Sequence, residues 1–104
     1  MKVENVLAIN TSQPGKVEVS LTKDEQKFEQ VSEQKFGSQV LLDLIMKILE
    51  QANLELKDLT EIEVNVGPGS FTGIKVGVSV ANALGFSLGI PVNGKRLETD
   101  LKYS

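Results

Sequence analysis

The chain contains no cysteine, no histidine and no tryptophan among its 104 residues. These absences exclude Cys or His nucleophiles, Ser-His-Asp triads, imidazole bases and metal centres with His or Cys ligands. Any metal ion would have to be a hard cation with oxygen ligands, and no metal site is predicted. A disulfide framework is excluded too, so the burial of apolar side chains must stabilise the fold.

Positive charge is also scarce, since 11 Lys and Arg face 14 Asp and Glu and give a net charge of −3. Unaided nucleic-acid binding usually needs a basic face, because phosphate contacts supply much of the affinity. Any contact with nucleic acid is therefore expected to be indirect. Glu4 interrupts what would be the apolar core of a signal peptide, so no export signal is predicted and a cytoplasmic protein is expected.

The first third of the chain has the patterns of three strands. Residues 3–9 form a short apolar run rich in β-branched residues, as in a strand buried on both faces. Residues 17–22 alternate between apolar and polar, which predicts a strand with one solvent-exposed face. Residues 27–33 are a weaker third strand. Short polar turns join the three, so an antiparallel meander is expected.

Helical periodicity begins after the meander, where apolar residues recur at three- and four-residue spacing over residues 38–52. Gly37 supplies a start signal and Asn53 a stop. Leu42 and Met46 widen the apolar arc beyond what packing on a single sheet requires. The arc is either a broad core face or a second contact surface for a partner helix.

The rest of the chain predicts a strand at residues 62–66, a helix over 72–88 and a short fifth strand near 90–92. Three hairpin strands followed by helix, strand, helix and strand is the element order of a ribonuclease H-like lobe. Helical crossovers connect strands that run in the same direction. The predicted fold class is therefore α/β, with a mixed five-stranded sheet and two main helices.

A glycine-rich turn, GPGSFTG, leads from the predicted strand into the second helix. Free backbone N–H groups and the positive end of a helix form a generic anion cradle at such a turn. A weak nucleotide site is predicted there from Thr11, Ser12, Gly67, Gly69 and Gly73. However, the loop lacks the Lys-Ser/Thr pair of the Walker A motif. The alternative is that the glycines only allow a tight turn and close packing.

Small residues recur at every fourth position along the second predicted helix, so one stripe carries almost no side chain. Each interior glycine costs about 1 kcal/mol of helix propensity relative to alanine, so packing on several sides must compensate. A helix that is apolar nearly all round is buried or shared with another chain, which predicts a protein–protein interface. The predicted interface residues are Leu42, Met46, Gly73, Gly77, Val78, Ala81, Leu84, Gly85 and Leu88.

A membrane-spanning function for this second helix is not expected. Lys75 and Asn82 lie inside it, and no basic segment precedes it.

The segment GPGSFTGIKVGVSVANALGFSLGIPV, residues 67–92, resembles the signature of the TsaB (YeaZ) family of tRNA threonylcarbamoyladenosine biosynthesis proteins. The opening VLAINTS, residues 6–12, and the segment SQVLLDLIMKIL with its LKDLTEIEV continuation are similar to that family as well. The resemblance implies an actin-like ATPase fold of two ribonuclease H-like lobes. Residues 1–94 would form the N-terminal lobe and 95–104 an atypical tail, with the family's second lobe absent.

The resemblance implies a non-catalytic scaffold subunit rather than an enzyme. Such a subunit forms a homodimer in isolation or pairs with a TsaD-type catalytic subunit through helices of its N-terminal lobe, and a TsaE-type ATPase joins them. The assembly transfers a threonylcarbamoyl group onto the adenosine beside the anticodon of tRNA.

The chain departs from the family pattern at several positions. Asn10 stands where the family usually has an acidic residue, Gly37 where many members carry a histidine, and Lys75 where an arginine is common. No catalytic residue and no cofactor are therefore carried over. Two alternatives stay open, namely a small nucleotide-binding ATPase-like lobe and a structural homodimer without a tRNA role.

Overall fold

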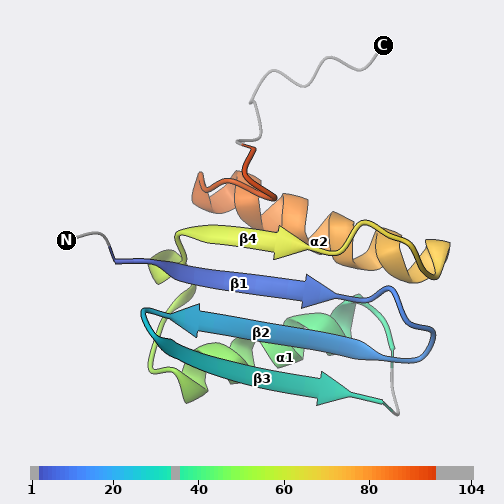
Figure 1. The fold of residues 1–104 in the computed structure, drawn as a ribbon, viewed down its shortest axis with the longest axis horizontal. Coiled ribbons are helices and arrows are strands. Elements are labelled where there is room, and N and C mark those ends of the chain that lie inside the picture. Colours follow the sequence, from blue (N-terminus) through green and yellow to red (C-terminus); the bar gives the residue numbers. More distant parts are fainter. Residues whose placement is uncertain (1–2, 34–35, 96–104) are drawn as a thin grey trace.

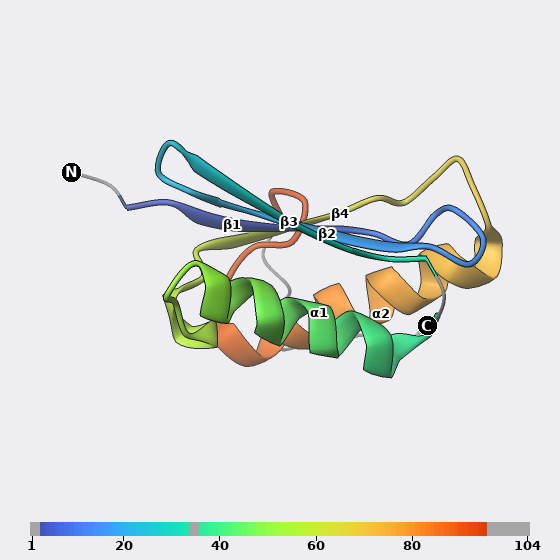
Figure 2. The ribbon, with the colours of Figure 1, turned by 90° about the horizontal axis from the view of Figure 1, so that it is seen from below.

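The computed structural model describes residues 3–33 and 36–95, which form a four-stranded sheet with both helices on one of its faces (Figure 1; Figure 2). α1 is amphipathic and α2 is apolar nearly all round, and both helices begin and end next to turn-forming residues, as their flanking residues indicate. Along the chain the elements are β1 (Asn5–Asn10), β2 (Val17–Lys23), β3 (Gln26–Ser32), α1 (Ser38–Gln51), the 3-10 helix η1 (Leu56–Asp58), β4 (Glu61–Val64) and α2 (Phe71–Leu88).

The sheet has the strand order β3-β2-β1-β4 and is mixed. β1 pairs antiparallel with β2, and β2 with β3, whereas β1 pairs parallel with β4. The helix α1 provides the connection from the end of the meander to β4, as a strand parallel to β1 requires. The predicted α/β class, the mixed sheet and the two main helices are confirmed.

The prediction of a fifth strand is wrong. Val92 makes only an isolated parallel bridge to Ile62. The chain then turns back at once, because Asn93 and Gly94 have positive φ angles of 51° and 79°, as an Asn-Gly turn favours. The Asn93 side chain pairs with the edge of β4 in place of a fifth strand. Its Oδ1 accepts the Val64 N–H at 2.8 Å, and its Nδ2 donates to the Val64 carbonyl at 3.0 Å.

The core lies between the sheet and the two helices. β1 and β2 bury alternate residues on their helix-facing side, as the period of two in a half-buried strand requires. Aliphatic side chains from the sheet and from α1 interdigitate there. The largest fully buried apolar side chains are Leu7, Leu21, Leu41, Ile45, Ile48, Leu49 and Ile62.

The two helices differ in what they bury. α1 turns five aliphatic side chains toward the sheet and ends before Asn53, whose φ of 60° confirms the predicted stop. α2 begins at the N-cap residue Ser70, whose hydroxyl accepts the Gly73 N–H at 3.3 Å, and ends at the left-handed Gly89. α2 would suffice to cross a membrane by length and composition alone, and 22% of it is buried in the fold.

Candidate functional site

The small-residue stripe of α2 faces the chain's own sheet. Gly73, Gly77, Ala81 and Gly85 are its buried residues. A side chain at Gly77 would collide with Thr11 and would crowd residues of β1 and β4. These four residues are buried within the chain itself, so partner contact at them stays a prediction that this packing does not support. Their spacing does signal the close approach of a second backbone, but that backbone belongs to the chain itself.

The turn after β1 packs directly on the glycine loop before α2. The Thr11 hydroxyl donates to the Gly73 carbonyl at 2.6 Å, and the Ser70 N–H donates to the Ser12 carbonyl at 2.7 Å. A Cβ atom at Gly69 would lie 2.6 Å from that same Ser12 carbonyl oxygen. Thr11 and Ser12 are thus packed directly against Gly73 and Gly69, whereas the group nearest to Gly67 is the Ile74 side chain.

Four N–H groups of the loop and the first turn of α2, those of Gly67, Ser70, Gly73 and Ile74, are bonded inside the chain. The Gly67 N–H donates to Asn65 Oδ1 at 2.8 Å, and the Ile74 N–H donates to the Ser70 carbonyl at 2.8 Å. Thr11 is fully buried and Ser12 is 6% exposed. These contacts agree with the close-packing alternative for the glycine loop. Nucleotide binding here stays a prediction.

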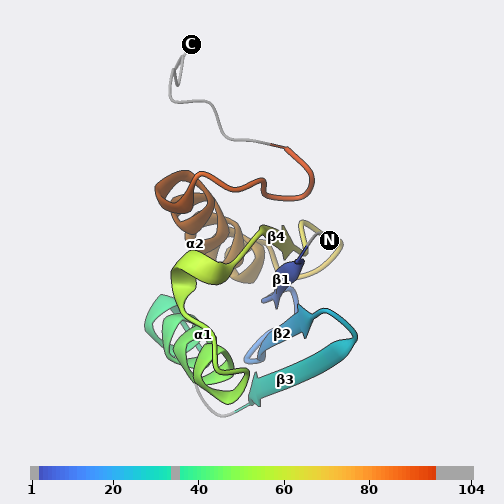
Figure 3. The same cartoon turned by 90° about the vertical axis from the view of Figure 1, so that its left-hand side faces the viewer.

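Large apolar side chains are exposed on the outer sides of both helices. Leu42 and Met46 of α1 are 38% and 53% exposed, and Phe71 and Phe86 of α2 are 74% and 48% exposed. Figure 3 shows the two helices side by side on the same face of the sheet. We call these four residues the helical face. Large apolar side chains exposed on two neighbouring helices can mark a protein–protein contact.

Of the predicted interface residues, Leu42 and Met46 are exposed, whereas Val78, Leu84 and Leu88 are half-buried against the core. A partner could reach the first two directly and the other three only at their exposed edges. Partner contact at all five positions stays a prediction.

Phe71 and Phe86 are missing from the predicted interface. Both fall in the polar strip of α2 with Lys75 and Asn82, at three- and four-residue spacing, which places them opposite the buried stripe. Lys75 Nζ lies 5.1 Å from the centroid of the Phe71 ring, within range of a cation–π contact. Aromatic residues in an otherwise polar strip are the signal that could have identified them.

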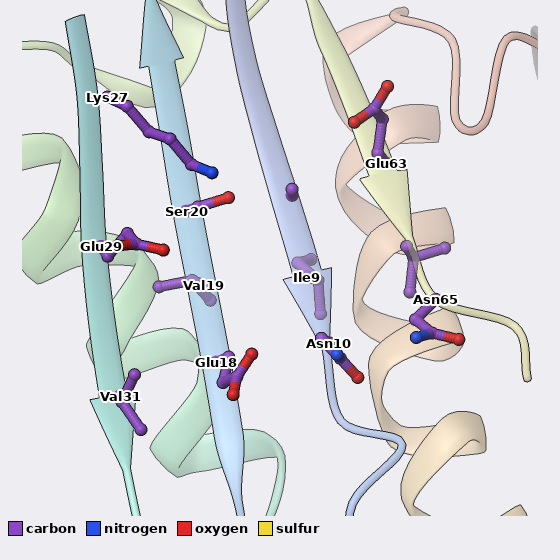
Figure 4. Close-up of a pocket in the computed structure, with 12 residues that line it drawn as sticks. Ile9, Asn10, Glu18, Val19, Ser20, Lys27, Glu29, Val31, Glu63 and Asn65 are labelled. Carbon is purple, nitrogen blue, oxygen red and sulfur yellow. The ribbon is translucent and has the colours of Figure 1, made fainter. Parts of the chain in front are cut away.

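The opposite face of the sheet is open within the described residues and forms a hollow of about 540 Å³. Figure 4 shows Glu18, Glu29 and Glu63 around it, with Lys27 as a cation. Lys16 Nζ lies 2.8 Å from a Glu18 oxygen, and this hydrogen-bonded contact raises the pKa of Lys16. A face of this polarity is typical of the solvated side of a sheet.

No group of three or more His, Cys, Asp or Glu in the described part of the chain could hold a metal ion.

A family model described as TsaD, tRNA N6-adenosine threonylcarbamoyltransferase, matches residues 30–94. The chain is 43% identical over 54 residues to the tRNA threonylcarbamoyladenosine biosynthesis protein TsaB of Buchnera aphidicola subsp. Schizaphis graminum, which is 52% of this chain and 26% of that protein. It is 39% identical over 56 residues to TsaB of Bacillus subtilis, covering 53% and 24% of the two chains. A tRNA N6-adenosine threonylcarbamoyltransferase of Tropheryma whipplei is 50% identical over 54 residues, covering 52% and 14%.

Among solved structures, YeaZ from Pseudomonas aeruginosa superposes with a TM-score of 0.79 at 28% identity, covering 86% of this chain and 42% of that one. A second structure, of an uncharacterized protein with similarity to peptidase YEAZ from Pseudomonas aeruginosa, has a TM-score of 0.80 at 28% identity and covers 86% and 41%. The chain thus spans about two fifths of these solved chains and a smaller part of the curated relatives.

Proposed function

Because the chain belongs to the TsaD family and to its TsaB (YeaZ) members, we propose that it is a non-catalytic subunit of the cytoplasmic machinery that makes threonylcarbamoyladenosine in tRNA. Relatives named for that pathway and neighbours named YeaZ support the pathway. The absence of cysteine and histidine in the sequence supports a non-catalytic function. The net charge of −3 supports indirect rather than direct contact with tRNA.

The observation that carries the proposal is the helical face. A large apolar side chain gains about 1.5–3 kcal/mol when it is removed from water, so a protein that covers this face would bind with a substantial hydrophobic contribution. Met46 and Phe71 are more than half exposed, and Phe86 is nearly so. On the opposite side of the sheet, four charged residues accompany one large exposed apolar side chain, Val31, which is 48% exposed. A partner that binds by burying apolar surface therefore gains more on the helical face than on the open face of the sheet.

The partner in this proposal is a TsaD-type catalytic subunit, and a TsaE-type ATPase joins the pair. The same face could also contact a second copy of the chain, so a homodimer would form in isolation and would give way to the heterodimer when the catalytic subunit is present. The chain would act as a scaffold, because its own contribution is a docking surface rather than a reacting group.

Calorimetric titration of the chain with a purified TsaD-type protein tests this proposal. The wild-type chain is expected to bind, and Met46→Lys is expected to weaken binding by at least about tenfold, or about 1.4 kcal/mol, because a charge would be placed in an apolar contact. Thr22→Lys is the matched control, since Thr22 is an exposed residue of β2. Binding at wild-type strength by Met46→Lys, or no binding by the wild type, would contradict the proposal.

A further inference from the structure

A groove lies beside the C-terminal end of α1, between the last turns of that helix and η1, which are adjacent in Figure 2. Its volume is about 670 Å³. Apolar and acidic side chains line it together. The lining residues are Met46, Leu49, Glu50, Asn53, Leu54, Glu55, Leu56, Lys57 and Asp58.

The charges around the groove are mainly negative, because three carboxylates accompany a single ammonium group. Lys57 Nζ lies 3.7 Å from Glu55 Oε2, and both side chains are about three-quarters exposed. The Asp58 carboxylate accepts the Glu55 N–H at 2.8 Å. Within the described residues, the Glu50 carboxylate has no hydrogen-bond or ion-pair partner. Glu50 is therefore available to a cation from outside.

The end of α1 adds to this negative potential. The C-terminal end of a helix carries a partial negative charge from its unpaired carbonyl groups, and the last turn of α1 contains no basic residue. Lys23 reaches one of these carbonyls from β2, since its Nζ donates to the Ala52 carbonyl at 3.0 Å. Lys23 does not line the groove, so the groove side of the helix end keeps its acidic character.

We propose that this groove receives a lysine or arginine side chain of the protein that docks on the helical face, an inference that rests on the proposed function. Met46 belongs both to the helical face and to the lining of the groove, so a protein that covers Met46 also reaches the groove. The aliphatic stem of a long basic side chain packs on apolar surface while its charged end stays polar. The half-buried side chains of Leu54 and Leu56 supply that surface, and Glu50 supplies a carboxylate for a charge-assisted hydrogen bond.

A second copy of the chain is a poorer occupant than a basic partner. Each copy carries a net charge of −3, so two copies repel each other on average. A partner that presents a basic residue at this position gains attraction without that overall repulsion. The groove therefore favours the heterodimer over the homodimer.

Glu50→Lys tests the inference, with the affinity for a TsaD-type protein measured at low and at high salt. Because Glu50 is exposed, its replacement should leave the fold intact. Binding should weaken by about tenfold at low salt, and the difference should narrow at high salt because screening weakens exposed charge pairs. Glu50→Gln should have an intermediate effect. Glu63→Lys is the matched control, since it makes the same charge change on the open face of the sheet.

The outcomes separate this inference from the proposed function. If the wild type binds, Met46→Lys binds at least about tenfold more weakly and Glu50→Lys binds like the wild type at every salt concentration, the groove inference is overturned and the proposed function stands. If Glu50→Lys and Glu63→Lys weaken binding equally, overall charge rather than the groove is responsible, and the inference is overturned as well. If the wild type does not bind, both are overturned.

Discussion

The helices α1 and α2 lie on the same face of one sheet and are held there in different ways. α1 buries the aliphatic residues Leu41, Leu44, Ile45, Ile48 and Leu49. α2 buries three glycines and an alanine, so its backbone rather than its side chains approaches the sheet. α1 thus fills the core with side-chain volume, whereas α2 brings its own backbone close enough for the Thr11 hydroxyl to bond the Gly73 carbonyl.

This difference determines what each helix leaves for other proteins. A helix that packs through glycines keeps its larger apolar side chains on its flanks and outer side, and Phe71 and Phe86 of α2 are exposed in this way. α1 exposes Leu42 and Met46 only because its apolar arc is wider than the sheet requires. The apolar content of a helix therefore does not show by itself which of its residues are buried. The side that packs on the sheet must be known first.

The largest expected effect comes from adding volume to the packed side of α2. Gly77→Leu should destabilise the fold by about 3 kcal/mol or more, because the new side chain has no space between α2, Thr11 and the sheet. Urea unfolding measures the change. Ser79→Leu, two residues further along on the exposed side of α2, should change stability by no more than about 0.5 kcal/mol. Equal stabilities of the two variants would show that α2 does not pack through its glycines.

Removing volume from α1 should have the next largest effect. Ile48 is fully buried, so Ile48→Ala should cost about 2–5 kcal/mol through lost burial and the cavity that remains. The control is Met46→Ala on the exposed side of the same helix, with an expected change within about 0.5 kcal/mol. Thermal unfolding followed by circular dichroism distinguishes them. A small effect at Ile48 would mean that side-chain volume does not hold α1 in place.

The smallest effect concerns how the helices begin. Ser70→Ala should destabilise the fold by about 1 kcal/mol, because the Gly73 N–H loses its side-chain acceptor. α1 begins without any side-chain cap, so Ser38→Ala should change stability by less than about 0.5 kcal/mol. Chemical denaturation of the two variants gives the comparison. A larger loss for Ser38→Ala than for Ser70→Ala would reverse it.

Much of the fold follows from periodicity in the sequence. The alternation over residues 17–22 and the helical spacing over 38–52 depend on which side of an element is buried, and both patterns predict the observed elements. Apolar content wrongly predicted a fifth strand near residues 90–92. The turn at Asn93 and Gly94 ends the pairing with β4 after a single residue, Val92. The predicted tail at 95–104 lies, beyond Lys95, outside the described residues.

The candidate site was harder to predict than the fold. The spacing of Gly73 and Gly77 reveals that a backbone comes close, but Thr11, which it meets, is distant in the sequence. Only the topology that places β1 beside β4 identifies that contact. The exposed side of α2 was easier to find, because Phe71 and Phe86 interrupt a polar strip in the sequence and both are exposed in the structure.

The central claim is that the exposed side of both helices binds a protein partner. The most direct test is the mass in solution, by light scattering, of the chain mixed with a TsaD-type protein, for the wild type and for Met46→Lys and Phe86→Lys. The wild type should form a complex with one copy of each protein, and both variants should remain separate from the partner. Separate masses for the wild-type mixture, or an intact complex with both variants, would contradict the account.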